Sequence, residues 1–172
     1  FEPSKKVLIV NGREITPAIR KLYDMKDVLF DRDFLNRAEN IDLYYMYRDL
    51  SLSKHEHEII KEHGLRYDIT VIPPQKLGRE YTKTYGHYHP VIENRNITYP
   101  EIYEVLEGKA HYLLQKMVEN RITDVILIEA EKGDKVIIPP NYGHITINPS
   151  NKILKMANWV ERNFKSVYEQ YR

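Results

Sequence analysis

The chain has 172 residues, enough for one domain with a hydrophobic core, and it contains no cysteine. Disulfides, thiolate nucleophiles and cysteine-bound zinc are therefore excluded, so a metal ion would have to bind through His, Asp or Glu. Because 26 Lys and Arg residues nearly balance 25 Asp and Glu residues, the charge gives no reason to expect a nucleic-acid partner. The apolar runs are too short to span a bilayer or to form a signal peptide, so we expect a cytoplasmic protein with no membrane partner.

The first third of the chain has a mixed pattern. Residues 5–10 read as a short strand that ends at the turn Asn11-Gly12. Thr16-Pro17 has the pattern of a helix N-cap followed by proline, which predicts helix within residues 16–38. The Tyr-rich residues 41–50 predict another strand. The other segments in which we expect helix are residues 53–63 and 162–171.

From residue 67 onward the pattern is that of short strands separated by Pro and Gly turns. The predicted strands are residues 67–72, 80–89, 101–106, 110–116, 124–129, 135–138, 145–148 and 153–160. Short strands at close spacing are typical of an antiparallel sandwich or barrel.

Two histidines, His87 and His89, are separated by one residue. On a strand they point to the same face, because strand side chains alternate with period 2. Farther along, Pro139-Pro140 ends a strand, and the next loop brings His144 to the same end of a barrel. Together with a carboxylate, three imidazoles form a metal site that leaves coordination positions open for substrate.

Two glutamates are candidates for the carboxylate ligand. Glu93 lies four residues after His89, but it belongs to a polar loop. Glu101 begins a clear strand, so its direction is fixed, and it lies seven residues before Gly108. We therefore expect Glu101 to be the ligand.

This pair of histidine patterns resembles the cupin superfamily. The resemblance implies an all-β fold, a jelly-roll-like double-stranded β-barrel with an N-terminal arm that carries short helices. We expect residues 1–172 to form a single domain, with residues 1–66 as arm and edge strands, residues 67–160 as the metal-binding barrel core, and residues 161–172 as a C-terminal segment.

Further motifs make the resemblance more specific, and it covers roughly residues 18–157. The chain resembles the archaeal, cupin-type glucose-6-phosphate isomerases. The shared motifs are Arg20-x-Leu22-x-Asp24-Met25, Tyr44-x-x-Tyr47, Thr84-x-Gly86-His87-x-His89, Pro100-Glu101-Ile102-Tyr103, Leu113-Leu114-Gln115 and Pro139-Pro140-x-x-x-His144-x-x-x-Asn148.

The resemblance implies a role for each matching position. One divalent metal ion per chain would be bound by His87, His89, Glu101 and His144, with Glu101 and His144 also catalytic. The metal would be Fe²⁺ first, with Ni²⁺, Mn²⁺ or Zn²⁺ as alternatives for this donor set. The sugar-phosphate ligands implied by the family are Thr70, Thr84, Gly86, Tyr103 and Tyr44. The family also implies a homodimer.

The implied reaction is the interconversion of glucose 6-phosphate and fructose 6-phosphate. Glu101 is the candidate base for moving a proton between C1 and C2, and a metal-assisted hydride shift is the rival mechanism. Alternative functions are another phosphosugar isomerase or epimerase, an iron dioxygenase, or a non-catalytic sugar-binding cupin. The family has a tyrosine near the position of Trp159 and a histidine after it that is absent here, so we expect the pocket wall to be altered.

The remaining histidines have structural explanations. The cluster His55-Glu56-His57-Glu58 with His63 lacks the spacing of a zinc-protease helix and is expected to be a solvated helix face. His111 lies on a strand and is expected to be structural.

Overall fold

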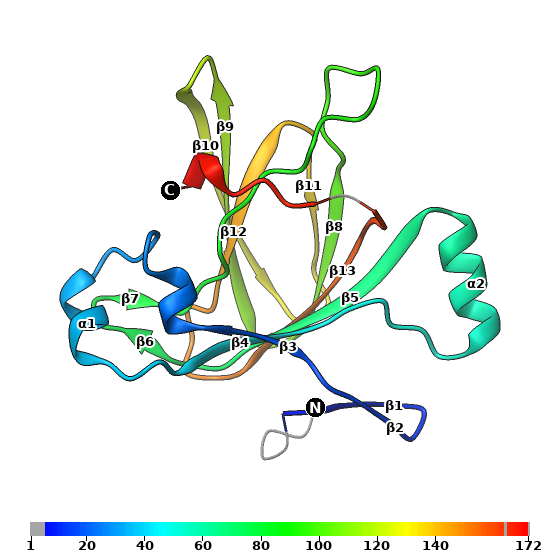
Figure 1. Ribbon diagram of the computed structural model, residues 1–172, viewed down its shortest axis with the longest axis horizontal. Helices are drawn as coiled ribbons and strands as arrows, with labels where there is room; N and C mark the ends of the chain where they lie inside the picture. Colours follow the sequence, from blue (N-terminus) through cyan, green and yellow to red (C-terminus); the bar gives the residue numbers. More distant parts are fainter. Residues whose placement is uncertain (1–5, 164, 172) are drawn as a thin grey trace.

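The chain was analysed in a computed structural model, in which residues 6–163 and 165–171 are described (Figure 1). The strands are β1 Leu8–Val10, β2 Arg13–Ile15, β3 Ala18–Lys21, β4 Asp42–Tyr47, β5 Leu65–Ile72, β6 Lys76–Leu77, β7 Glu80–Tyr81, β8 Glu101–Glu107, β9 Lys109–Val118, β10 Arg121–Glu131, β11 Lys135–Ile138, β12 Tyr142–Ile147 and β13 Leu154–Glu161. The helices are α1 Arg32–Arg37 and α2 Lys54–Glu62, with 3₁₀ turns η1 Leu22–Met25 and η2 Glu169–Tyr171.

The barrel is built from two sheets that enclose the main core. The larger sheet has the strand order β11-β8-β13-β5-β4-β3, and the smaller has the order β10-β9-β12. Every pairing between neighbouring strands is antiparallel. Apolar side chains from both sheets, including Leu114 of β9 and Met156 of β13, form one buried cluster. The prediction of a mostly β, antiparallel fold is confirmed.

Strand alternation determines which side chains enter the barrel. In β8, Glu101, Tyr103 and Val105 are buried, whereas Ile102 is exposed. The buried residues share the inner face because successive side chains of a strand point to opposite faces.

Two parts of the chain lie outside the barrel. The β1–β2 hairpin packs on the outer face of the larger sheet, where Leu8 joins a second core cluster with Tyr45 and Val71 (Figure 1). Helix α2 agrees with the predicted helix at residues 53–63 and is capped by Ser53, whose hydroxyl accepts a hydrogen bond from Glu56 N at 3.1 Å. None of the helices in the described part of the chain is long and apolar enough to cross a membrane.

Of the two other segments predicted to contain helix, residues 16–38 do contain η1 and α1 but begin as a strand, and residues 162–171 contain only a short 3₁₀ turn among their described residues. Residues 16–38 begin with strand β3, in which Arg20 pairs with Tyr44 of β4, and α1 is confined to six residues. Pairing with an existing sheet outweighed the local helix signal of Thr16-Pro17. Residues 162–171 contain only η2 among their described residues, because backbone hydrogen bonds between Tyr88 and Val167 (2.8 and 2.9 Å) hold that part of the chain extended.

The predicted strand at residues 80–89 is also wrong in most of its length. Regular pairing ends with β7 at Tyr81, and the chain continues through isolated bridges. One of these bridges pairs His87 with His144 of β12. The His-x-His segment is therefore held by only a few backbone hydrogen bonds.

Candidate metal centre and substrate cavity

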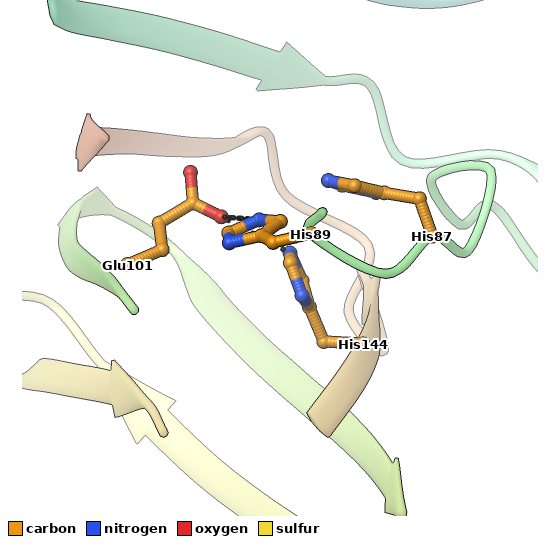
Figure 2. Close-up of side chains that lie close together, drawn as sticks. All are labelled: His87, His89, Glu101 and His144. Carbon is orange, nitrogen blue, oxygen red and sulfur yellow. Dashed lines mark ion pairs between the residues drawn. The ribbon is translucent and has the colours of Figure 1, made fainter. Parts of the chain in front are cut away.

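Four side chains converge at one end of the barrel interior: His87, His89, Glu101 and His144 (Figure 2). One potential ligand atom from each lies within 4.8 Å of those of the other three. His89, Glu101 and His144 are buried, and His87 is partly exposed. The structure therefore brings together the four residues that the sequence suggested as metal ligands.

Different elements deliver these side chains. His87 and His144 are directly opposite each other, with backbone N–O distances of 3.3 and 3.0 Å between the two residues. Glu101 is the first residue of β8, and its side chain faces inward. His89 precedes Pro90, and a hydrogen bond between its ring and the backbone carbonyl of Tyr99 fixes its position.

The tautomer of His89 follows from that hydrogen bond. Its Nδ1 lies 2.7 Å from the carbonyl oxygen of Tyr99, which can only accept, so Nδ1 carries the proton. In the neutral ring, Nε2 then presents a lone pair, and it lies 3.1 Å from Oε2 of Glu101. Two acceptors that face each other at this distance require a cation or an additional proton between them, which is the arrangement expected at a metal site.

Glu101 is held at both of its oxygens. Oε1 accepts a hydrogen bond of 2.7 Å from Asn158, and Oε2 lies 3.3 Å from Nε2 of His144 as well as close to His89. Burial alone would raise the pKa of Glu101, but His144 and His89 outweigh it and the net shift is downward. The carboxylate is therefore ionised at neutral pH.

Two neighbouring groups, His87 and Tyr103, are uncharged at neutral pH. Burial and the neighbouring His144 lower the pKa of His87 to about 3. The hydroxyl of Tyr103 lies 3.1 Å from Nε2 of His144, and burial together with Glu101 raises the pKa of Tyr103 far above its usual value. A carboxylate beside three imidazoles is a donor set that fits a divalent transition metal.

A cavity lies beside this cluster. It is lined by residues of β3, β4, β5, β8 and β13, of the segments that follow β4 and β7, and of the C-terminal segment: Arg20, Tyr44, Met46, Arg48, Arg66, Asp68, Thr70, Thr84, Tyr85, His87, Glu101, Tyr103, Met156, Asn158, Val160, Ser166 and Tyr168. Four of the five predicted substrate ligands, Tyr44, Thr70, Thr84 and Tyr103, are among them.

Two hydroxyl groups of the cavity lining accept hydrogen bonds from backbone N–H groups. Tyr44 Oη accepts a hydrogen bond of 3.1 Å from Tyr85 N, and Thr84 Oγ accepts one of 3.0 Å from Thr146 N. Each hydroxyl keeps its own proton available for donation into the cavity.

Gly86, the fifth predicted ligand, does not line the cavity. It lies where a Cβ atom would come within 2.5 Å of the Tyr171 ring and 2.7 Å of Ile145. The absence of a side chain is thus explained by close packing beneath the C-terminal segment.

Trp159 does not form part of the cavity wall, contrary to expectation. Trp159 lies on the outer face of β13, 38% exposed, with its ring centroid 4.8 Å from that of Tyr67. Its neighbour Asn158 faces the cavity instead, because the two residues alternate along the strand.

The sequence interpretation missed three residues of the site. Asn158 contacts Glu101, Arg20 lines the cavity, and Tyr168 packs against His87 with ring centroids 5.8 Å apart. The alternation along residues 153–160 was a signal for Asn158. Arg20 was visible only as part of a motif, and no local pattern indicated Tyr168.

The remaining histidines lie apart from the centre. His57 is 3.0 Å from Oδ2 of Asp49 on the surface side of α2, and His111 is 3.5 Å from Glu129. Neither belongs to the metal-ligand cluster found among the described residues.

Solved structures similar to this chain indicate its fold. An oxalate oxidase in complex with the substrate analogue glycolate superposes with a TM-score of 0.54 at 14% identity, covering 73% of this chain and 54% of that one. The Bacillus subtilis oxalate decarboxylase studied for its Mn(II) centres gives a TM-score of 0.53 at 15% identity, covering 78% and 30%. These likenesses support a cupin-like fold and, at such low identity, nothing more.

Curated relatives are more similar in sequence. The glucose-6-phosphate isomerase of Thermococcus litoralis is 32% identical over 135 residues, 78% of this chain and 64% of the relative. That of Pyrococcus furiosus is 29% identical over 131 residues, 76% of this chain and 62% of the relative. The chain thus spans somewhat less than two thirds of the length of these relatives.

The family described as "Glucose-6-phosphate isomerase (GPI)" matches residues 19–172, which include the cluster and every residue that lines the cavity. On that match and on its cupin-like barrel, the chain belongs to the cupin-type glucose-6-phosphate isomerase family.

Proposed function

We propose that the protein is a metal-dependent aldose–ketose isomerase that interconverts glucose 6-phosphate and fructose 6-phosphate. The observation that carries this proposal is the convergence of His87, His89, Glu101 and His144 at the edge of a polar cavity, in a chain of the isomerase family. The curated relatives bear the name of this activity.

The four clustered residues would hold the metal ion. Support comes from the donor set and from the facing acceptors His89 Nε2 and Glu101 Oε2. When bound, the ion supplies Lewis-acid polarisation at the substrate oxygens. Fe²⁺ is our first candidate because the family resemblance suggests it, with Ni²⁺, Mn²⁺ and Zn²⁺ as alternatives that the same donors accept.

Glu101 would transfer the proton. In the direction from aldose to ketose, its carboxylate takes the proton from C2 and returns it to C1 of the open-chain sugar. The ionised state required of a base agrees with the lowered pKa of Glu101. Asn158 keeps one oxygen of the carboxylate in a fixed direction during the transfer.

Tyr103 and His144 would assist at the oxygens. Since Tyr103 stays protonated and lies 3.1 Å from His144, its hydroxyl can donate a hydrogen bond to a substrate oxygen or to the imidazole. Tyr103 is therefore placed to help the hydroxyl proton move as the carbonyl changes position, while the neighbouring His144 holds the metal ion beside it.

The opposite part of the cavity would hold the sugar and its phosphate. Thr70, Thr84 and Tyr44 present hydroxyl groups there, which are good phosphate ligands. Gly86 has no side chain, and its Cα is packed against Tyr171, so it would contribute only through its backbone.

We further propose a cytoplasmic homodimer built from single cupin domains. Edge strand β10 exposes apolar side chains, with Val125 57% and Leu127 54% accessible, which gives a second copy a surface to cover.

Metal removal and restoration tests the function. The purified protein is assayed for conversion of fructose 6-phosphate to glucose 6-phosphate as isolated, after EDTA treatment, and after add-back of each candidate ion, with bound metal measured in parallel. We expect activity to disappear with the metal and to return with it. Absence of conversion by fully loaded protein would refute the glucose-6-phosphate assignment.

The same preparation separates the alternatives. Turnover of a different phosphosugar only, such as mannose 6-phosphate, would identify another isomerase or epimerase. Binding of fructose 6-phosphate without turnover of any phosphosugar would identify a non-catalytic sugar-binding cupin.

A further inference from the structure

We propose that Arg20 is the cation that binds the substrate's phosphate and so selects phosphorylated over free sugars. This inference rests on the proposed function, because it concerns the ligand of the same cavity. Arg20 lies on β3 directly opposite Tyr44 of β4 and lines the cavity together with Thr70 and Thr84. Three proposed phosphate ligands and the Arg20 guanidinium therefore line the same cavity.

Arg20 differs from the other arginines of this cavity in its counter-ion. Arg48 and Arg66 both pair with the buried carboxylate of Asp68, at 3.2 and 2.8 Å. Within residues 6–163 and 165–171, no carboxylate oxygen lies within 4.0 Å of the Arg20 guanidinium. Arg20 is thus the cavity arginine that has no ion-paired carboxylate among these residues.

Arg20 is partly buried, and one of its donors is shielded from water. Its Nε atom is buried and has no hydrogen-bond partner among the described residues, and the group lies 5.8 Å from the centroid of the Tyr85 ring. A buried donor without a partner costs free energy, and this cost is removed if an anion enters the cavity and accepts its hydrogen bonds. At this distance the ring of Tyr85 can attract the positive charge of the guanidinium.

The chemistry of the side chain matches a phosphate rather than a neutral hydroxyl. A guanidinium offers several N–H donors in a rigid fork that pairs with two phosphate oxygens at once. The hydroxyls of Thr70 and Thr84 can bind the remaining oxygens. His87 and Glu101 line the same cavity, so a ligand anchored at Arg20 extends toward the metal centre.

Binding of a ligand that cannot react tests this role apart from catalysis. The probes are sorbitol 6-phosphate and inorganic phosphate, titrated calorimetrically into the metal-loaded protein, its Arg20→Met and Arg20→Lys variants, and the control Arg13→Met. Arg13 is exposed on β2, away from the cavity lining. Melting temperatures of all variants establish that they are folded.

We expect Arg20→Met to weaken sorbitol 6-phosphate binding about 10- to 100-fold, as the loss of charge-assisted hydrogen bonds predicts. Arg20→Lys should bind with intermediate affinity because it keeps the charge without the fork, and it serves as the test if Arg20→Met does not fold. In kinetics, KM for fructose 6-phosphate should rise much more than kcat falls. Arg13→Met should match the parent.

The outcomes separate this inference from the proposed function. Parent-like binding of sorbitol 6-phosphate by the Arg20 variants, or failure of the parent to bind it, overturns the role of Arg20. Binding by the parent that depends on Arg20, in a protein without isomerase activity, supports the phosphate site and overturns only the assigned reaction.

Discussion

Asn158 donates a hydrogen bond of 2.7 Å to Oε1 of Glu101, and both side chains are buried, with 6% and 4% of their surface exposed. The two residues lie on adjacent strands, because β13 pairs with β8 and sets Asn158 opposite Tyr103. The amide fixes one carboxylate oxygen while the other faces His89 and His144. Asn158 is therefore a positioning residue for the carboxylate.

Replacing Asn158 should reduce turnover without removing the metal. In Asn158→Ala we expect kcat to fall about 10- to 100-fold, a typical effect of losing a group that orients a metal ligand. KM should change little, because the substrate's hydroxyl and phosphate contacts remain. Steady-state kinetics and metal analysis measure both effects, with the exposed Asn151→Ala as control. An unchanged kcat in Asn158→Ala would remove Asn158 from the site.

The choice between the two candidate carboxylates can be tested directly. Glu101→Ala should abolish turnover, since it removes both a metal ligand and the proposed base, whereas Glu93→Ala should retain it because Glu93 is exposed. Metal content should fall in the first variant alone. Equal activities in Glu101→Ala and the parent would mean that this carboxylate takes no part in the reaction.

Proton transfer by Glu101 predicts exchange with solvent. When fructose 6-phosphate is converted in D₂O, the glucose 6-phosphate formed should carry deuterium at C2, because a carboxylic acid exchanges its proton with water. Mass spectrometry and NMR measure the incorporation. A direct hydride shift leaves C2 without deuterium, so its complete absence would favour that mechanism.

Asp49 should make stability depend on acid pH. Hydrogen bonds from Arg162 (2.9 and 2.6 Å) outweigh the effect of burial and, with His57, lower the pKa of Asp49 to about 2 from its ordinary 3.8. A folded-state pKa below the unfolded one means that the contribution is present above about pH 4 and lost as the pH falls toward 2.

Urea unfolding measures this contribution. At pH 7 we expect Asp49→Asn to be less stable than the parent by roughly 1 kcal/mol, a modest value because the carboxylate is partly exposed. The difference should shrink as the pH approaches 2. A difference that stays constant from pH 7 to pH 2 would show that the ion pair does not titrate with folding.

Trp159 should matter for stability but not for the substrate. Since its ring packs on Tyr67 outside the barrel, Trp159→Ala should leave KM for fructose 6-phosphate within about twofold while lowering the free energy of unfolding by about 1–2 kcal/mol. Tyr168→Ala, at a cavity position, should raise KM instead. A large KM change in Trp159→Ala would place its side chain at the substrate.

The cluster of proposed ligands could be predicted because each residue has a local or family signature. His87 and His89 are spaced for one face, Glu101 begins a strand with clear alternation, and His144 follows a proline stop. The antiparallel β fold followed from strand spacing and turn residues.

The remaining features depend on pairing between distant segments. The contact between Asn158 and Glu101 requires the register of β13 against β8, which no local pattern specifies. Residues 18–21 form strand β3 because they pair with the edge of β4, and this pairing outweighs the local preference for helix. The path of the C-terminal segment is set by a bridge between Tyr88 and Val167, whose positions differ by 79 residues.

Successive side chains of strand β13 point to opposite faces and so contribute to two different surfaces. Asn158 faces the cavity, and Trp159 helps to line an apolar surface pocket with Leu50 and Ile60. Insertion or deletion of one residue within this strand would exchange the two sets, putting an indole beside Glu101 and an amide on the surface. A change in the length of this strand would therefore disturb both surfaces at once, whereas a substitution on one face would leave the other in place.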